Sequence, residues 1–320
     1  MPEYSGYLVF NQIYKLESEI DLEKFSKEFT FNTEQRGTPS EPQRSVSEVM
    51  LPARTVDEPL PREFLRILDE EVRWFKYTIE EFREQKGLDD QGEPATFYVR
   101  DERNCDIFVT SDGYLFFKGP SGIVDESTQM VLKRLETSEL NTLFEEVEFT
   151  PDFLLWLMYV YNSNNSLPSK IQIKRLTDAK VIGDQSEFGK SNRVSGSVDA
   201  SLSAPVLTGI LVGKDMAMIG GIFNLEGVML TVDVESDGRV HIKSGQDLSE
   251  FGSEGRIVSS ITFLRELCIL WEHWCSLPPN KKYPPDDFFI NSYERLQSAG
   301  VNVDYNIDPV IDEYRQKRGE

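Results

Sequence analysis

Three carboxylates near position 235 have the residue types and spacing to hold a divalent cation. Asp233, Glu235 and Asp237 alternate with other residues, and together with Gly238 they match the first half of a calcium-binding loop. On a strand, Asp233 and Glu235 would project from one face, because successive side chains point to opposite faces. A metal bound here would support hydrolysis of a phosphodiester or a related bond.

The second half of the calcium pattern is missing. Ser244 stands where the loop needs its last carboxylate, and the flanking residues indicate strands rather than helices. Glu226 or His241 would have to supply the remaining ligands. The alternative interpretation is a hairpin whose acidic side chains face solvent.

A second candidate site is a cluster of cations in an otherwise acidic chain. Residues 168–195 have a net charge of +3, whereas residues 1–167 sum to −16 and residues 196–320 to −8. A cationic strand face can hold several phosphates, and each contact adds salt-sensitive affinity. The interpretation we favour is that these cations pair with the acidic N-terminal lobe or only contribute to the solvated surface, and the alternatives are binding of a polyanion and binding of an acidic protein. The cations of this basic island are Lys170, Lys174, Arg175, Lys180, Lys190 and Arg193.

The loop GDQSEFGKS does not satisfy the phosphate-binding pattern that it suggests. Gly183 and Gly189 are six residues apart, whereas the glycines of a P-loop are five apart. The residues that follow also lack the pattern of a helix whose N-terminus would hold the phosphates. The sequence therefore does not favour nucleotide hydrolysis at this loop.

Composition limits thiol and imidazole chemistry. The chain has three cysteines and two histidines, with no C-x-x-C pair. This argues against a disulfide framework and against a thiolate zinc site. We expect Cys105, Cys268 and Cys275 to be reduced and mostly buried.

The overall charge restricts the class of partner. A net charge of −21 with a pI near 4.6 repels nucleic acids and anionic membranes over most of the surface. Such a surface is typical of a highly soluble protein. The alternatives are mimicry of nucleic acid and an acidic face that docks on a basic partner.

Two observations predict a cytoplasmic protein that does not enter a membrane. The longest apolar run covers residues 153–161, whereas a membrane-spanning helix needs about 20 residues. The N-terminal segment MPEYSGYLVF also lacks the basic region and the cleavage site of a secretory signal.

In the N-terminal half, a strand at 7–14 and an amphipathic helix at 22–29 precede a Pro-rich extended arm at 36–61. Pro61 can begin a helix that Gly87 ends. The apolar stripe of that helix would be Phe64, Leu68, Val72, Phe75, Ile79 and Phe82. Beyond it we expect strands at 96–100, 106–110 and 114–118, a hairpin turn at 111–113, and helices at 126–136, 138–146 and 153–161.

The C-terminal half has a different pattern. NSNNSLPS at 162–169 has the composition of a linker, so we predict domains at 1–165 and 166–320. Glycine-punctuated apolar runs then indicate an antiparallel meander covered by a helix at 257–275, with another helix near 288–298. The expected strands are 170–176, 179–182, 206–212, 216–223, 228–234 and 239–243.

Together these patterns predict an α+β fold. It would consist of a mixed α/β N-terminal lobe followed by a predominantly antiparallel β C-terminal lobe covered by amphipathic helices. The arm, the amphipathic helices and the lack of a catalytic constellation favour a non-catalytic accessory subunit of a larger protein or nucleoprotein assembly. We therefore expect a protein partner and no cofactor. The alternatives are a metal-dependent hydrolase or nuclease using the carboxylates of 226–241, and a nucleic-acid-binding module using the basic island.

Overall fold

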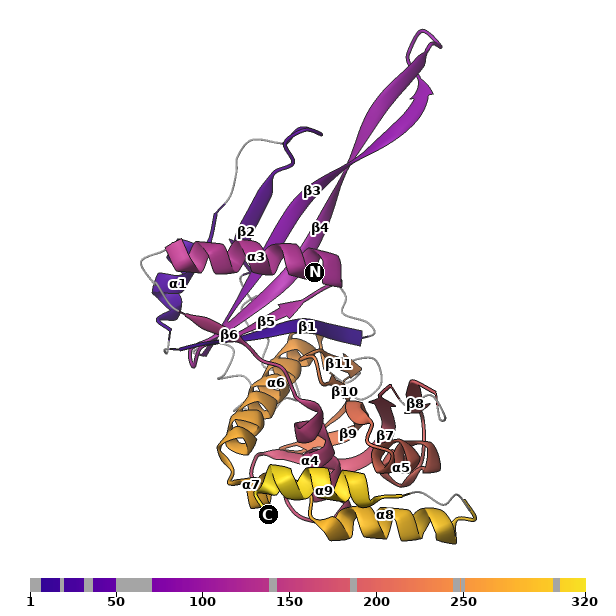
Figure 1. Cartoon of the computed structure of the whole chain (residues 1–320). Helices are drawn as coiled ribbons and strands as arrows, with labels where there is room; N and C mark the ends of the chain where they lie inside the picture. The colour runs from indigo at the N-terminus through magenta and orange to yellow at the C-terminus, as the bar shows by residue number, and fades with distance from the viewer. Residues whose placement is uncertain are drawn as a thin grey trace. The chain divides into compact units, whose positions relative to one another are not determined.

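The computed structural model describes residues 7–17, 20–31, 37–49, 71–137, 143–184, 189–243, 248, 251–301 and 306–320. The fold is α+β, as predicted, with one eleven-stranded antiparallel sheet among the described residues. The strand order is β2-β3-β4-β5-β1-β11-β10-β9-β7-β8, and β6 pairs with β1. The chain divides into two compact units (Figure 1), which we describe separately. Unit 1 comprises Met1–Leu8 and Val147–Glu320, and unit 2 comprises Val9–Glu146.

Among its described residues, unit 2 packs two helices against its strands. The elements are β1 (Tyr7–Leu16, whose first two residues belong to unit 1), α1 (Leu22–Phe29), β2 (Arg44–Glu48), β3 (Val72–Leu88), β4 (Pro94–Thr110), β5 (Tyr114–Lys118), α3 (Ser121–Thr137) and β6 (Phe144–Glu146). An aromatic cluster joins α1 to β3. The rings of Phe25 and Phe29 lie 5.8 and 4.9 Å from that of Phe75, and all three are buried.

The predicted helix after Pro61 is wrong where it can be compared. Residues 61–70 lie outside the described residues, and Val72–Leu88 form the long strand β3. Phe75, Tyr77 and Ile79 alternate with less buried residues, which is the two-residue period of a strand. Phe75 and Ile79 suit either period, and pairing with β2 and β4 selects the strand.

Other parts of unit 2 follow the sequence more closely. The strand at 7–14, the helix at 22–29 and the hairpin turn at 111–113 are confirmed, and Gly113 adopts the positive φ of 90° that the turn requires. The predicted strands 96–100 and 106–110 are one strand, β4. The predicted helix 138–146 is wrong at its end, where 144–146 form β6, and 138–142 lie outside the described residues. Of the Pro-rich arm, residues 44–48 form β2, while 36 and 50–61 are not described.

Unit 1 contains the remaining elements. They are α4 (Pro151–Asn162), β7 (Ile171–Ile182), β8 (Ser191–Val194), the 3-10 helix η2 (Ala200–Leu202), α5 (Ala204–Leu211), β9 (Asp215–Leu225), β10 (Val228–Glu235), β11 (Val240–Lys243), α6 (Ser253–Ser276), α7 (Pro279–Lys282), α8 (Asp286–Ser298) and α9 (Asp308–Arg318). The sheet packs against α6 through Phe223 and Phe263, whose rings lie 5.5 Å apart.

The predicted strand at 206–212 is a helix, α5. Pro205 stands in the first turn of α5, where its fixed φ suits a helix and its missing N–H costs nothing. Gly209 lets the helix approach β7 closely, because a Cβ at this position would lie 2.2 Å from Val181. A continuous apolar run fits a buried helix as well as a buried strand, and the close packing on β7 selects the helix.

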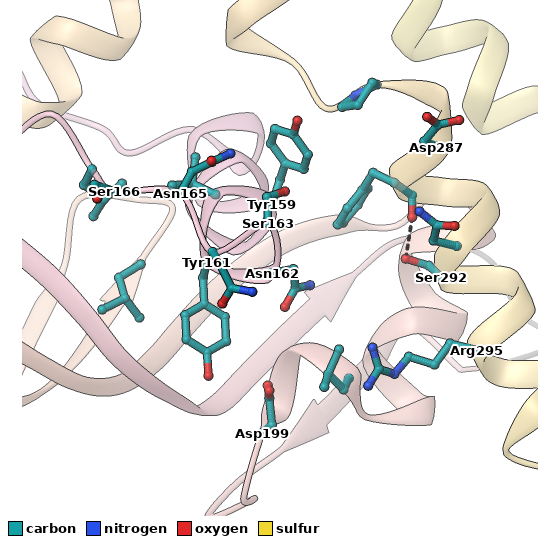
Figure 2. A pocket seen from close by; sticks show the side chains of 18 of the residues that line it. Tyr159, Tyr161, Asn162, Ser163, Asn165, Ser166, Asp199, Asp287, Ser292 and Arg295 are labelled. Carbon is teal, nitrogen blue, oxygen red and sulfur yellow. Dashed lines mark hydrogen bonds between the residues drawn. The ribbon is translucent and has the colours of Figure 1, made fainter.

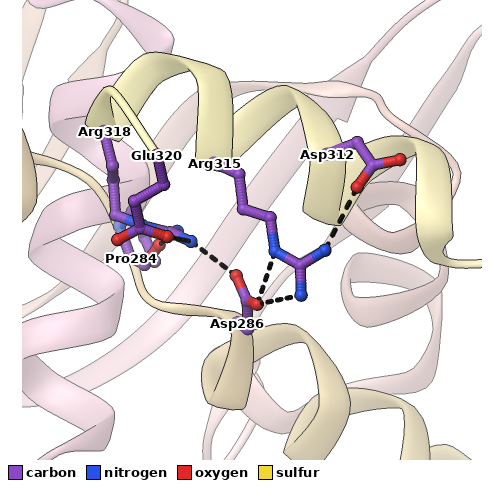
Figure 3. Close-up of polar contacts among 6 residues, drawn as sticks. All are labelled: Pro284, Asp286, Asp312, Arg315, Arg318 and Glu320. Atoms are coloured by element: carbon purple, nitrogen blue, oxygen red, sulfur yellow. Dashed lines mark hydrogen bonds and ion pairs between the residues drawn. The ribbon is translucent and has the colours of Figure 1, made fainter.

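A charged cluster fastens α9 to the start of α8. The Asp286 carboxylate accepts hydrogen bonds from Arg315 at 2.8 Å and from Arg318 at 2.5 Å (Figure 3). Arg318 is almost completely buried and also donates to the Pro284 carbonyl and the Glu320 carboxylate. Burial alone would raise the pKa of Asp286, but the hydrogen bonds from the two guanidinium groups hold it below its ordinary value.

The segment 162–169 follows directly on α4 and lies within unit 1. The division of the chain into domains at this segment stays a prediction. Among the described helices, none combines the length and apolarity needed to cross a bilayer.

Candidate functional site

Strand register brings two of the predicted candidate sites onto one face of the unit 1 sheet. Asp178 pairs with Gly220, Gly220 with Asp233, and Asp233 with His241. Directly paired residues share a face, so this row places two carboxyl groups and an imidazole side by side. Gly220 makes the row compact, because a Cβ there would lie 2.1 Å from Asp233 Oδ1 and 3.0 Å from Asp178 Cβ.

Cations flank this row on both sides. The next row on one side pairs Glu235 with Met218, Met218 with Lys180, and Lys180 with Arg193. The next row on the other side contains Lys243, Thr231, Ile222 and Arg175. We call this surface the charged face and define it by Arg175, Asp178, Lys180, Arg193, Asp233, Glu235, His241 and Lys243.

The pKa values of the two aspartates in the central row are shifted in opposite directions. Burial would raise the pKa of Asp178, but hydrogen bonds from the Ser195 and Thr177 hydroxyls and the Gly196 amide hold it below its ordinary value. Burial raises the pKa of Asp233, against the opposing charge of Lys243. Asp233 Oδ1 is buried without a hydrogen-bond partner in the described structure. The row therefore sets a carboxyl group whose pKa is lowered beside one whose pKa is raised.

Two of the three predicted metal ligands, Glu235 and Asp237, already form ion pairs with a cation. Arg239 lies 3.0 Å from Glu235 and 2.6 Å from Asp237, and His241 Nε2 lies 3.5 Å from Glu235. Asp237 belongs to the turn between β10 and β11, so it is not in the row of Asp233. Within the described ranges, no three Asp, Glu, His or Cys side chains gather closely enough to hold a metal ion. The metal site stays a prediction.

The basic island is divided among several places. Arg175, Lys180 and Arg193 lie on the charged face, where Lys180 and Arg193 are direct cross-strand neighbours. Lys170 forms an ion pair with Glu226 at 3.4 Å, and Lys174 lines a cavity described below. Lys190 is exposed just before β8. Binding of a polyanion by the whole island stays a prediction.

The Cys105 thiol is not an activated nucleophile. Cys105 and Cys268 are buried, as predicted for most of the cysteines, and Cys275 is exposed. Burial raises the pKa of the Cys105 thiol to about 12, so this group stays protonated at neutral pH.

The most prominent feature of unit 2 is a long two-stranded ribbon formed by β3 and β4. The strands pair along their full length, from Val72 opposite Thr110 to Leu88 opposite Pro94. β2 pairs only with residues 75–79 and β5 only with residues 106–109, so the outer part of the ribbon has both edges open among the described strands. In Figure 1 the ribbon runs well beyond β2 and α3 of the same unit.

The outer ribbon exposes large apolar side chains. Leu88, Phe97, Tyr98 and Val99 are 66%, 45%, 54% and 47% exposed. Phe97 covers Gly87 of the opposite strand, since a Cβ on Gly87 would lie 3.2 Å from its ring. Ion pairs between Arg83 and Asp101 and between Arg103 and Glu81 connect the two strands.

A buried carboxylate marks the base of the exposed part. Glu80 accepts hydrogen bonds from the amides of Gly37 and Gln43 at 2.8 and 3.2 Å. It also pairs with Arg100 at 2.7 Å. These contacts tie the described part of the Pro-rich arm to the ribbon.

Unit 1 contains a cavity of about 1130 Å³. Its walls are the end of α4 with the segment 162–169, the start of β7, the region of η2 and α5, and one side of α8. Figure 2 shows Tyr159, Tyr161 and Asn162 on one wall and Ser292 and Arg295 on α8. The supposed linker at 162–169 is thus a wall of this cavity.

Sequence reasoning missed both the ribbon and the cavity. The outer parts of β3 and β4 contain many charged residues. These residues interrupt the alternation of apolar and polar side chains that identifies a strand, so the sequence does not reveal how long the two strands are. For the cavity, the run of Asn and Ser at 162–166 was the available signal, but the same composition is typical of linkers.

Comparison with protein-family models and with curated proteins gives no relative for this chain. No protein-family model matches it, and no curated protein matches it either.

Proposed function

We propose that this protein is a non-catalytic interaction protein that binds a protein partner through the outer β3–β4 ribbon. The observation that carries the proposal is the exposure of Leu88, Phe97, Tyr98 and Val99 on a ribbon with two open edges. An isolated two-stranded ribbon is marginally stable in water, and burial of its apolar side chains by a partner would stabilise it. Open strand edges also offer main-chain hydrogen bonds to an incoming segment.

The energetic gain from such a contact is substantial. Burying large side chains that are half exposed contributes about 25 cal/mol for each Å² of apolar surface removed from water. Aromatic residues are also enriched among the residues that dominate protein interfaces. Phe97 and Tyr98 are therefore the residues expected to contribute most.

The test is co-purification from the native host at native expression. We expect a stoichiometric protein to accompany the wild-type chain and to be lost from a variant carrying Phe97→Ser, Tyr98→Ser and Val99→Ser. The matched control is Leu143→Ser, which removes another exposed apolar side chain of unit 2, 66% exposed, away from the ribbon. Thermal unfolding checks that both variants are folded.

Retention of the partner by the triple variant, or the absence of any stoichiometric partner, would overturn the proposal. The hydrolase and nucleic-acid-binding alternatives stay predictions. The charged face mixes Asp178, Asp233 and Glu235 with its cations, so phosphates tracking across it would meet carboxylates as well.

A further inference from the structure

The cavity of unit 1 has a lining without net charge. The charged side chains on its walls are Lys174, Arg295, Asp199 and Asp287, two of each sign. In a chain with a net charge of −21, this balance is a local property of the cavity. Strongly charged ligands such as nucleotides or polyphosphates would find no matching field there.

Neutral hydrogen-bonding groups dominate the walls. Half of the lining residues carry an amide or a hydroxyl group, including Asn162, Asn165, Gln172, Asn291 and Ser292. Each amide offers two donors and an acceptor, and each hydroxyl can act as either. Such a lining matches a ligand whose own groups both donate and accept, as the hydroxyls of a sugar do.

Part of this lining is held in place by the protein. Asn162 accepts a hydrogen bond from the Ser201 hydroxyl at 2.7 Å. The Ser292 hydroxyl donates to the Phe288 carbonyl at 2.7 Å (Figure 2). Tyr159 packs edge-on against Phe288, with ring centroids 5.7 Å apart. Burial and the nearby Asp199 raise the pKa of Tyr161, so its hydroxyl remains a donor at neutral pH.

Aromatic surface completes the match. Tyr159, Tyr161 and Phe288 line the cavity and supply apolar ring surface beside polar groups. The C–H faces of a sugar ring are apolar while its rim is polar, so such a ligand suits walls of this mixed kind. At about 1130 Å³, the cavity exceeds the roughly 300–1,000 Å³ of common ligand sites and has room for several sugar rings.

We propose that this cavity binds a neutral oligosaccharide. The site is independent of the ribbon and of the partner proposed above. Asn165 from the segment after α4 and Asn291 from α8 lie on different walls, and both are exposed enough to reach a ligand.

The experiment is isothermal titration calorimetry of the full chain with four neutral trisaccharides: maltotriose, cellotriose, mannotriose and N,N′,N″-triacetylchitotriose. Tripolyphosphate and a capped trialanine peptide are the comparison probes. We expect saturable binding of at least one trisaccharide, with a dissociation constant of about 1 mM or tighter. The double substitution Asn165→Ala and Asn291→Ala should weaken it about tenfold or more, since each removes hydrogen bonds to the ligand.

Gln297→Ala is the matched control, because it removes another exposed amide of α8 that does not line the cavity. It should leave the affinity unchanged. The proposal is overturned if none of the four trisaccharides binds, or if the double variant binds as tightly as the wild type. Binding of the peptide or of tripolyphosphate in their place would assign the cavity to a different ligand class and equally overturn it.

Discussion

Asp178 and Asp233 lie beside the same glycine, but their environments shift the pKa of the two carboxyl groups in opposite directions. Hydroxyl and amide donors surround Asp178, whereas the buried Oδ1 of Asp233 has no partner in the described structure. Burial is the leading influence on both carboxyls, and only Asp178 has donors that outweigh it. Of the two carboxyl groups, Asp233 is therefore the one that is protonated at the higher pH.

Replacing Asp233 by Asn should raise the melting temperature at pH 7 and have little effect near pH 3. Folding raises the pKa of Asp233, so this group contributes stability to the folded protein below its unfolded pKa of about 3.9. This contribution to stability is lost as the pH rises through the pKa of Asp233 in the folded protein. An amide avoids that loss. Thermal unfolding of both proteins across this pH range checks the prediction, and an unchanged difference at all pH values would contradict it.

Asp237→Asn is the control of opposite sign. Burial would raise the pKa of Asp237, but hydrogen bonds and the charge of Arg239 lower it. Its stabilising contribution is present above pH about 3.9 and is lost as the pH falls through the folded pKa. Because the side chain is half exposed, removal should cost less than about 1 kcal/mol at pH 7.

Strand β7 packs closely beside β9 because Gly220 and Gly221 of β9 carry no side chains. Its pairing with β9 shifts register between Ile173 and Arg175 and again between Leu176 and Asp178. A Cβ on Gly221 would lie 2.0 Å from the Arg175 carbonyl, and a Cβ on Gly220 would meet the Asp233 carboxylate. The irregularity of β7 and the glycine pair thus depend on each other.

Gly221→Ala should therefore lower the free energy of unfolding, measured in urea, by about 2 kcal/mol or more, and by more than Gly220→Ala does. The reason is that a backbone carbonyl cannot move aside as a side chain can. In an Asp233→Ala background the cost of Gly220→Ala should fall, while that of Gly221→Ala should not change. The double-mutant cycle separates the two obstacles. Equal costs for Gly220→Ala in both backgrounds would show that Asp233 is not what opposes a side chain there.

Elements with local signals could be predicted from the sequence, and elements decided by distant packing could not. Asp21 caps α1 through the amides of Glu23 and Lys24, and Gly113 and Gly238 mark the tight turns of two hairpins, all within a few residues of the element. By contrast, residues 72–88 and 206–212 have apolar patterns that fit helix and strand alike. Pairing or packing with residues far along the chain decides between helix and strand in both segments.

The candidate sites divide in the same way. The sequence identified Asp233, Glu235 and three cations that the fold places on one face. It could not identify Asp178 as their neighbour, because the row that joins them depends on the register of β7 against β9. The cavity likewise needs α8 beside the segment 162–169, which are more than 100 residues apart.

At the scale of the whole molecule, the net charge of −21 should oppose folding through self-repulsion. Raising sodium chloride from about 10 mM to about 500 mM shortens the range of that repulsion, so the melting temperature should rise. Potassium chloride at equal ionic strength should give the same shift, which separates screening from specific ion binding. A melting temperature that falls with salt would show that ion pairs such as Arg318 with Asp286 outweigh the repulsion.

The outer ribbon has apolar residues on both of its faces. Tyr98 shares one face with Leu88, and Phe97 shares the other with Val99, as the register requires. A single flat surface can cover only one of these pairs. A partner that buries all four side chains must therefore enclose the ribbon, or two partner surfaces must hold it between them. The alternation of side chains along two strands thus sets the shape that a binding surface must have.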